Sequence, residues 1–222
     1  MTSIGGHINA TRRAGELGVH SMDHIDLIVP DLKIAQKFYS SFGLDVREED
    51  NALGLYTAGG GHRWISISEG DRKHLRHLSF GVFEDDFHRF KRHVENLGQE
   101  LFDPPPGSGS TGLWLRDPDG QLIELRVAEK TSPNDKPSFD KPPGRPGVPA
   151  APKRSAAGFV RPRRMAHVLV FTREVPRAID FYSRVLGLRV SDRSGDGICF
   201  MHGIHGSDHH LLALVKSSAP GF

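Results

Sequence analysis

The chain has 222 residues and a mass of 24.5 kDa, more than one average domain and less than two large ones. Hydrophobic residues make up 37% and the net charge is +2, which excludes global disorder and gives no support to a nucleic-acid or anionic-membrane surface. The one cysteine, Cys199, cannot form an intramolecular disulfide, and no apolar run is long enough to span a bilayer. We therefore expect a soluble, cytoplasmic protein with no membrane or nucleic-acid partner.

A segment rich in Pro, Gly and Lys/Arg separates two parts of the chain. It lacks apolar periodicity, which predicts an extended connector over residues 131–163. We accordingly expect an N-terminal extension over residues 1–19, an N-terminal domain over residues 20–130 and a C-terminal domain over residues 164–222.

The two domains share an internal repeat that begins at a histidine. His24 and His167 each open an apolar stretch, and each is followed fourteen positions later by Phe-Tyr-Ser and then by Gly-Leu. A more diverged repeat begins near His77. Chance does not plausibly give this register, so the sequence predicts three modules, at roughly 20–70, 73–128 and 164–216.

The first module is predicted to fold as β-α-β-β-β. The apolar stretch after its histidine alternates as a strand does. Residues 31–42 then predict an amphipathic helix, capped by Asp31 and stopped by Gly43. Short strands are expected near residues 52–56 and 64–68.

The second module follows the same plan. Its helix is expected at residues 85–97, with Gly98 at its end, and its last two strands flank a turn at residues 117–120. The sequence thus predicts an α+β fold of paired β-α-β-β-β modules whose sheets form a cupped surface.

Histidine near the start of the first strand in all three modules is the sharpest signal. A single such residue would be explained by a local hydrogen bond, whereas three in register favour a functional role. Glu124 lies among apolar residues on a last strand, where an unpaired carboxylate is costly if it faces inward. Alternation alone places Glu124 outward just as readily. If two modules form one cup, His24, His77 and Glu124 converge, and this donor set suits Fe(II) or a similar divalent ion.

The histidine-initiated strand, the Phe-Tyr…Gly-Leu helix end and the Arg-Asp-Pro-Asp-Gly…Ile-Glu-Leu hairpin of residues 116–125 resemble the vicinal oxygen chelate superfamily. This superfamily includes glyoxalase-like lyases, antibiotic-resistance binding proteins and type I extradiol ring-cleaving dioxygenases. The resemblance covers nearly everything from residue 22 onward except the connector. It implies the fold and a homo-oligomer, but it leaves the reaction open because one fold serves many chemistries.

The third module narrows the choice among the reactions of this superfamily. Residues 208–215, which begin Asp-His-His, are similar to the extradiol dioxygenase strand whose second histidine is an acid/base beside the metal, which implies that role for His210. The resemblance also implies that His167 is a metal ligand. Imidazole titrates in the range needed to move a catechol proton. The two histidines of this strand could instead be surface residues, and Phe200 and Met201 could contact an aromatic ring or pack in the core.

The sequence departs from the extradiol pattern in two ways, and these leave open which pair of modules carries the catalytic site. Such a dioxygenase has four modules, with a second histidine ligand and a glutamate in the fourth, whereas this sequence stops at Phe222, where a fourth would begin. We expect a chain that continues; a natural fragment or pairing with another subunit are the alternatives. In the first pair, aligning residues 62–64 with residues 209–211 places Arg63 at the acid/base position, and arginine cannot act as a base near neutral pH.

The first pair of modules could therefore hold a metal without cleaving rings, or be a relic whose His and Glu side chains only hydrogen-bond; the family pattern favours the relic. If the 222 residues are the complete chain, this pair becomes the favoured site. The predicted function is Fe(II)-dependent cleavage of a small aromatic diol by O2. The alternatives are a glyoxalase-like lyase or isomerase using His24, His77 and Glu124 with Mn, Zn or Ni, and a metal-free module that binds a small molecule.

Overall fold

The computed structural model describes residues 12–132, 145–147, 153–156, 158–219 and 221. Much of the predicted connector and of the N-terminal extension lies outside these residues. Within the connector the structure shows one short 3-10 turn, η1 (Arg154–Ala156). No helix in the described ranges is both long enough and apolar enough to cross a membrane.

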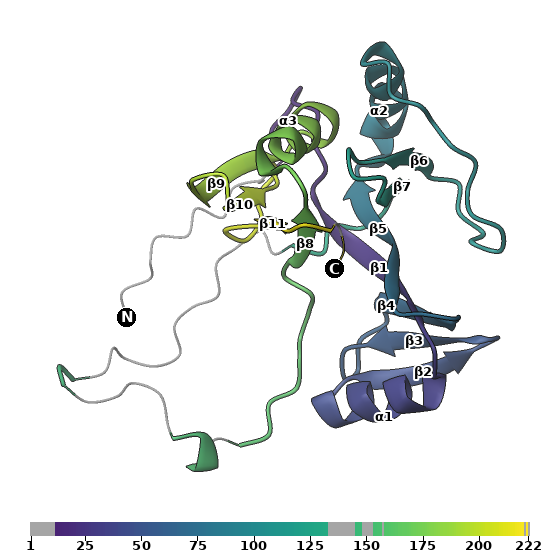
Figure 1. Ribbon diagram of the computed structural model, residues 1–222, viewed down its shortest axis with the longest axis vertical. Helices are drawn as coiled ribbons and strands as arrows, with labels where there is room; N and C mark the ends of the chain where they lie inside the picture. Colours follow the sequence, from purple (N-terminus) through teal and green to yellow (C-terminus); the bar gives the residue numbers. More distant parts are fainter. Residues whose placement is uncertain (1–11, 133–144, 148–152, 157, 220, 222) are drawn as a thin grey trace.

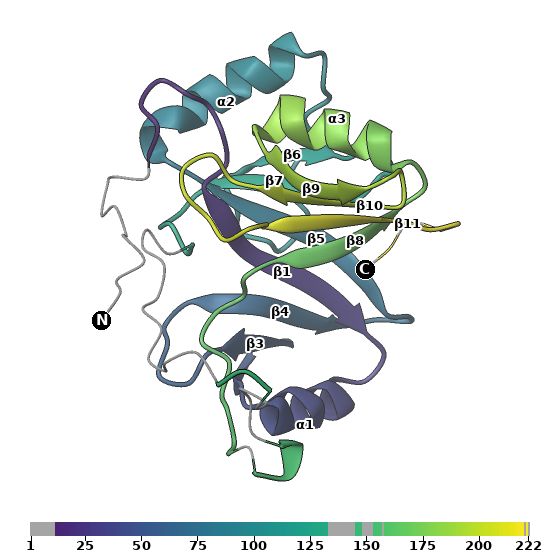
Figure 2. The ribbon, with the colours of Figure 1, turned by 90° about the vertical axis from the view of Figure 1, so that its left-hand side faces the viewer.

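All three predicted modules are present (Figures 1 and 2). The first consists of β1 (Ser21–Val29), α1 (Leu32–Phe42), β2 (Asp45–Glu49), β3 (Ala52–Tyr56) and β4 (Arg63–Glu69). The second consists of β5 (His74–Val82), α2 (Glu84–Asn96), β6 (Leu113–Arg116) and β7 (Leu122–Val127). The third consists of β8 (Val168–Thr172), α3 (Val175–Leu186), β9 (Arg189–Ser194), β10 (Ile198–His202) and β11 (Leu212–Lys216).

One strand of the second module is reduced to a single bridge between Phe102 and Trp114. The chain that follows, residues 103–109, is Asp-Pro-Pro-Pro-Gly-Ser-Gly. Proline has no backbone N–H to donate to a ladder, and glycine weakens a strand, so this segment cannot extend the pairing.

The predicted boundaries of the first helix are confirmed by its caps. The Asp31 carboxylate accepts a hydrogen bond from the backbone N–H of Ile34 at 2.9 Å, which satisfies one free N–H of the first turn. Gly43 ends α1 with a φ of 102°, a conformation that side chains with a Cβ rarely adopt. Helix α2 also forms where it was expected, shifted by one residue.

The first two modules share one seven-stranded sheet in the order β2-β3-β4-β1-β5-β7-β6. Strand β1 lies in its centre, parallel to β4 and antiparallel to β5, and β5 runs parallel to β7. The register pairs His24 with Ser79 and Ser79 with Glu124. Residues in one row across a sheet project from the same face, and His77 joins them because it lies two positions from Ser79.

The third module forms a four-stranded sheet in the order β8-β11-β10-β9, with β8 at its edge. Within the described residues, the free edge of β8 pairs only through a bridge between Phe171 and Gly221. Leu169 and Phe171 on this strand are each 37% exposed. The third module therefore has the open edge and exposed apolar side chains expected of a sheet without a partner module.

The third module packs against the second. Helix α2 contacts α3 through the His93 imidazole, which lies 2.7 Å from the carbonyl oxygen of Arg184. The buried Tyr182 hydroxyl donates to Asp117 at 3.0 Å, so the predicted turn after β6 contacts α3.

Candidate functional site

Three potential metal ligands converge on one face of the seven-stranded sheet. His24 on β1, His77 on β5 and Glu124 on β7 are 7%, 3% and 1% exposed. Their ligand atoms all lie within 4.8 Å of one another. The Nε2 atoms of the two histidines are 3.2 Å apart, and His24 Nε2 is 4.0 Å from Glu124 Oε2. Glu124 thus faces inward, not outward.

Each end of this cluster is held by neighbouring polar groups. His24 Nδ1 lies 2.7 Å from Asp23 Oδ2. The hydroxyls of Ser79, at 2.6 Å, and Ser110 donate to the two oxygens of the Glu124 carboxylate. These bonds offset the cost of burying an ionised glutamate.

The protonation states suit metal binding. Burial, reinforced by the nearby His24 and arginine side chains, lowers the pKa of His77 to about 3, so this imidazole is neutral at physiological pH. Burial acts to raise the pKa of Asp23, but the hydrogen bond and charge of His24, with Arg126 and His62, outweigh it and leave the pKa below its usual value. The cluster therefore offers neutral imidazole nitrogen beside a carboxylate, with a second carboxylate behind.

The spacing of the nitrogen atoms fits a metal ion. Two nitrogens bound at ~2.0–2.1 Å to one ion lie about 2.8–3.4 Å apart at angles between 90° and tetrahedral. The 3.2 Å separation of His24 Nε2 and His77 Nε2 falls in this range. Two imidazoles and a carboxylate are also the donor set that open-sided divalent sites use. The three residues therefore fit a divalent cation.

Arg63 occupies the position of the first module that corresponds to His210 in the third. The β1–β4 and β8–β11 pairings have the same register, and Arg63 and His210 each lie two residues before the first paired residue of the repeat. Arg63 forms an ion pair with Glu49 at 2.7 Å, and Glu49 also accepts from the Tyr56 hydroxyl. At this position the first module therefore holds an ion pair, and arginine cannot act as a base near neutral pH.

The third module presents a different pair of histidines. His167 is exposed and directly precedes β8, and its ring centroid lies 4.1 Å from that of the half-buried His210. The Phe200 ring lies 4.9 Å from His210, whereas Met201 is fully buried in the core. Burial, followed by the charges of His167 and His209, lowers the pKa of His210. In the described part of the chain, no third His, Cys, Asp or Glu forms a ligand group with this pair.

Several groups around the two sites were not foreseen. The Asp-His dipeptide at residues 23–24 was the available signal for Asp23, whereas nothing local marked the loop residue Ser110. Gly112 allows Glu124 to approach, because a Cβ there would meet the Glu124 side chain at 2.8 Å. His205 in the third module is fully buried and accepts a hydrogen bond from the backbone N–H of Arg13 through Nδ1.

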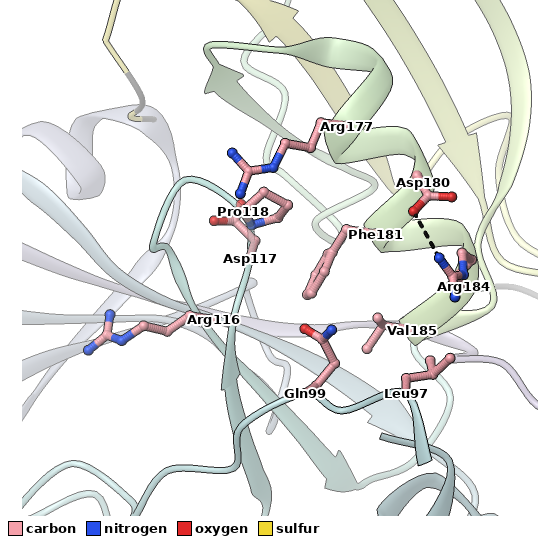
Figure 3. A pocket seen from close by; sticks show the side chains of 10 residues that line it. All are labelled: Leu97, Gln99, Arg116, Asp117, Pro118, Arg177, Asp180, Phe181, Arg184 and Val185. Carbon is pink, nitrogen blue, oxygen red and sulfur yellow. Dashed lines mark hydrogen bonds and ion pairs between the residues drawn. The ribbon is translucent and has the colours of Figure 1, made fainter. Parts of the chain in front are cut away.

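Two cavities lie away from these histidines. A cavity of about 400 Å³ between the second and third modules is lined by Arg116, Arg177 and Phe181 among others (Figure 3). A more apolar groove of about 890 Å³ runs between α1 and β8, with Phe38 and Phe171 on its walls.

The sequence is similar to that of metapyrocatechase 2 from Cupriavidus necator, at 46% identity over 206 residues. That match covers 92% of this chain and 63% of the relative, so the chain spans less than two thirds of the relative's length.

Solved structures share the predicted α+β fold. The Mn(II)-bound glyoxalase from Novosphingobium aromaticivorans has a TM-score of 0.66 at 20% identity, over 93% of this chain and 64% of that one. The 2,3-dioxygenase LapB from Pseudomonas sp. KL28 has a TM-score of 0.67 at 18% identity, over 92% of this chain and 73% of that one.

The family model of the Glyoxalase/Bleomycin resistance protein/Dioxygenase superfamily matches residues 21–125 and 164–221. The gap between these segments corresponds to the connector, and the segments contain the three repeated modules. The chain therefore belongs to this superfamily, as its repeated sequence motifs predicted.

Proposed function

We propose that the protein acts in extradiol cleavage of a catechol-type ring by O2 at a non-haem Fe(II) centre, in the cytoplasm and as a homo-oligomer. The observation that carries this proposal is the 46% identity to metapyrocatechase 2. Identity at this level over most of the chain supports a related substrate, a small aromatic diol. Iron, when bound, supplies the redox chemistry toward O2.

We assign the reacting face to the third module. His210 is placed to take a proton from a substrate hydroxyl and return it later, since its lowered pKa leaves the imidazole neutral. His167, in ring contact with His210, is exposed and free to serve as a metal ligand. The described residues supply no further ligand there, so His167 by itself does not make an iron site. Phe200 offers an aromatic surface beside His210.

A second candidate function is favoured by the cluster of His24, His77 and Glu124, the complete ligand group among the described residues. A glyoxalase-like lyase or isomerase could use it with a divalent ion other than iron. Against this stands Arg63, which forms an ion pair at the place where His210 lies in the third module.

The experiment is oxygen uptake on catechol after anaerobic loading with Fe(II), together with metal analysis and detection of a yellow ring-opened product. We expect His167→Ala and His210→Gln to lower the rate at least 100-fold, and His24→Ala to leave it within a few-fold. If His24→Ala abolishes oxygen uptake while His167→Ala and His210→Gln leave it intact, the catalytic site lies in the first pair of modules. A bound non-redox metal with no O2 consumption would favour the lyase or isomerase.

A further inference from the structure

We propose that Asp23 is a positioning residue that fixes the tautomer of His24, and that it thereby prepares the His24, His77 and Glu124 cluster for a divalent cation that stabilises the first two modules. This proposal does not depend on ring cleavage. It rests on contacts in the interior of the seven-stranded sheet.

The bond between Asp23 and His24 determines which ring nitrogen carries the proton. An ionised carboxylate can only accept, so His24 Nδ1, 2.7 Å from Asp23 Oδ2, must donate. In the neutral ring the lone pair is then on Nε2, the atom that faces His77 and Glu124. The same arrangement orients histidine ligands in many metal sites.

Asp23 is itself held in place. It is 6% exposed, and Arg126 Nε lies 3.8 Å from Oδ2, the oxygen that receives the His24 proton. His62 bonds the backbone carbonyl of Asp23 at 2.7 Å and lies 3.9 Å from Oδ1. These contacts hold the Asp23 carboxylate beside His24 Nδ1.

The other two histidines that begin a repeat lack this support. His77 Nδ1 is buried with no hydrogen-bond partner among the described residues, and its ring is contacted at the edge by Trp114. His167 follows Ala166, which has no side-chain acceptor. Among these three histidines, the neighbouring carboxylate therefore belongs to His24, which the first module contributes to the cluster.

A cation at this place would join the modules. His24 belongs to the first module, while His77 and Glu124 come from two strands of the second. Any ion that binds the folded state and not the unfolded chain raises stability, by an amount that grows with the logarithm of its concentration divided by its Kd. The cation would therefore hold together β1, β5 and β7, three adjacent strands of the sheet.

The test uses Zn²⁺, a redox-inert probe, on the full chain. We expect one Zn²⁺ to bind and raise the melting temperature, and Glu124→Gln and His77→Ala to remove both effects. Asp23→Asn should weaken Zn²⁺ binding 10- to 100-fold, the range found when partners of metal-bound histidines are removed. Asp45→Asn, the same carboxylate-to-amide change at a partly exposed residue of β2 that pairs with Arg47, is the matched control and should change the affinity less than twofold.

Long-range ¹H–¹⁵N spectra of the metal-free protein give an independent readout. His24 should carry its proton on Nδ1 in the wild type and shift at least partly to Nε2–H in Asp23→Asn, since the amide can donate to Nδ1. Retention of both the Nδ1–H form and the Zn²⁺ affinity in Asp23→Asn would overturn the proposal. So would Zn²⁺ binding that persists in Glu124→Gln. Neither readout involves catechol or O2, so loss of ring cleavage would leave this result unaffected.

Discussion

The first strands of the first and third modules have similar sequences but lie in different surroundings. Strand β1 lies in the middle of a seven-stranded sheet and buries His24. Strand β8 is an edge, and His167 before it is exposed. The repeat thus sets where each histidine stands on the backbone, whereas the neighbouring strands decide whether it can join a buried ligand cluster.

The two places also retain different parts of a site. The first has Asp23 beside His24 and a group of three possible ligands, with Arg63 at the position that corresponds to His210. The third has His210 in ring contact with His167, but no ligand cluster among the described residues. The proposals above therefore assign an ion to the first region and proton transfer to the third.

The largest effect should come from exchanging the residues at the acid/base position. His210→Gln is expected to lower kcat/KM for catechol 10²- to 10⁴-fold, the usual contribution of a general acid/base. Arg63→Gln, the matched change in the first pair, should lower it less than threefold. Steady-state oxygen uptake measures both, and equal losses would contradict the division of roles.

The burial of β1 and the exposure of β8 predict unequal costs of truncation. Ile25→Ala, at a side chain 2% exposed, should lower the free energy of unfolding by about 2–5 kcal/mol. Leu169→Ala, at 37% exposure, should cost less, about 1–2 kcal/mol, because more than a third of this side chain already faces water and its loss leaves no closed cavity. Urea unfolding gives both values. A Leu169 effect as large as that of Ile25 would show that a partner covers β8.

Much of this comparison was predictable from sequence, because it depends on local patterns. The repeat register placed all three histidines, and Asp31 and Gly43 marked the ends of α1. The contacts of Asp23 and Ser110 could not be read in this way, since they depend on side-chain conformations and on a loop path. The inward direction of Glu124 was equally open until the pairing of β5 with β7 fixed its face.

Protonation of His20 in acid should destabilise the first region. His20, just before β1, is fully buried, and burial lowers its pKa to about 4 although its backbone hydrogen bonds oppose this. The corresponding residue of the repeat, Arg163, is exposed. The unfolded chain binds the proton below about pH 6.5, so stability is complete above that pH and falls toward pH 4 by about 3 kcal/mol.

Urea unfolding of the wild type and His20→Gln at pH 7 and pH 4.5 measures this linkage. The variant should lose less stability between the two pH values than the wild type does. The pKa of His77 is also lowered, so His77 contributes to the pH dependence of unfolding in both proteins. This contribution cancels when the variant is compared with the wild type. If the stability of the two proteins depends equally on pH, groups other than His20 cause the acid sensitivity.

The smallest effect concerns the tyrosine of the Phe-Tyr-Ser motif. Tyr182 is fully buried and donates to Asp117 across the boundary between the second and third modules. Tyr182→Phe should cost about 1–2 kcal/mol, since a hydrogen bond to a charged group is lost. The cost stays in this range because Asp117 keeps its bonds from the backbone N–H groups of Asp119 and Gln121.

Tyr39, the half-buried equivalent in the first module, is the matched control, and Tyr39→Phe should change stability by less than about 0.5 kcal/mol. If both changes cost the same, the motif tyrosine stabilises each helix by itself, and the bond to Asp117 does not couple the modules.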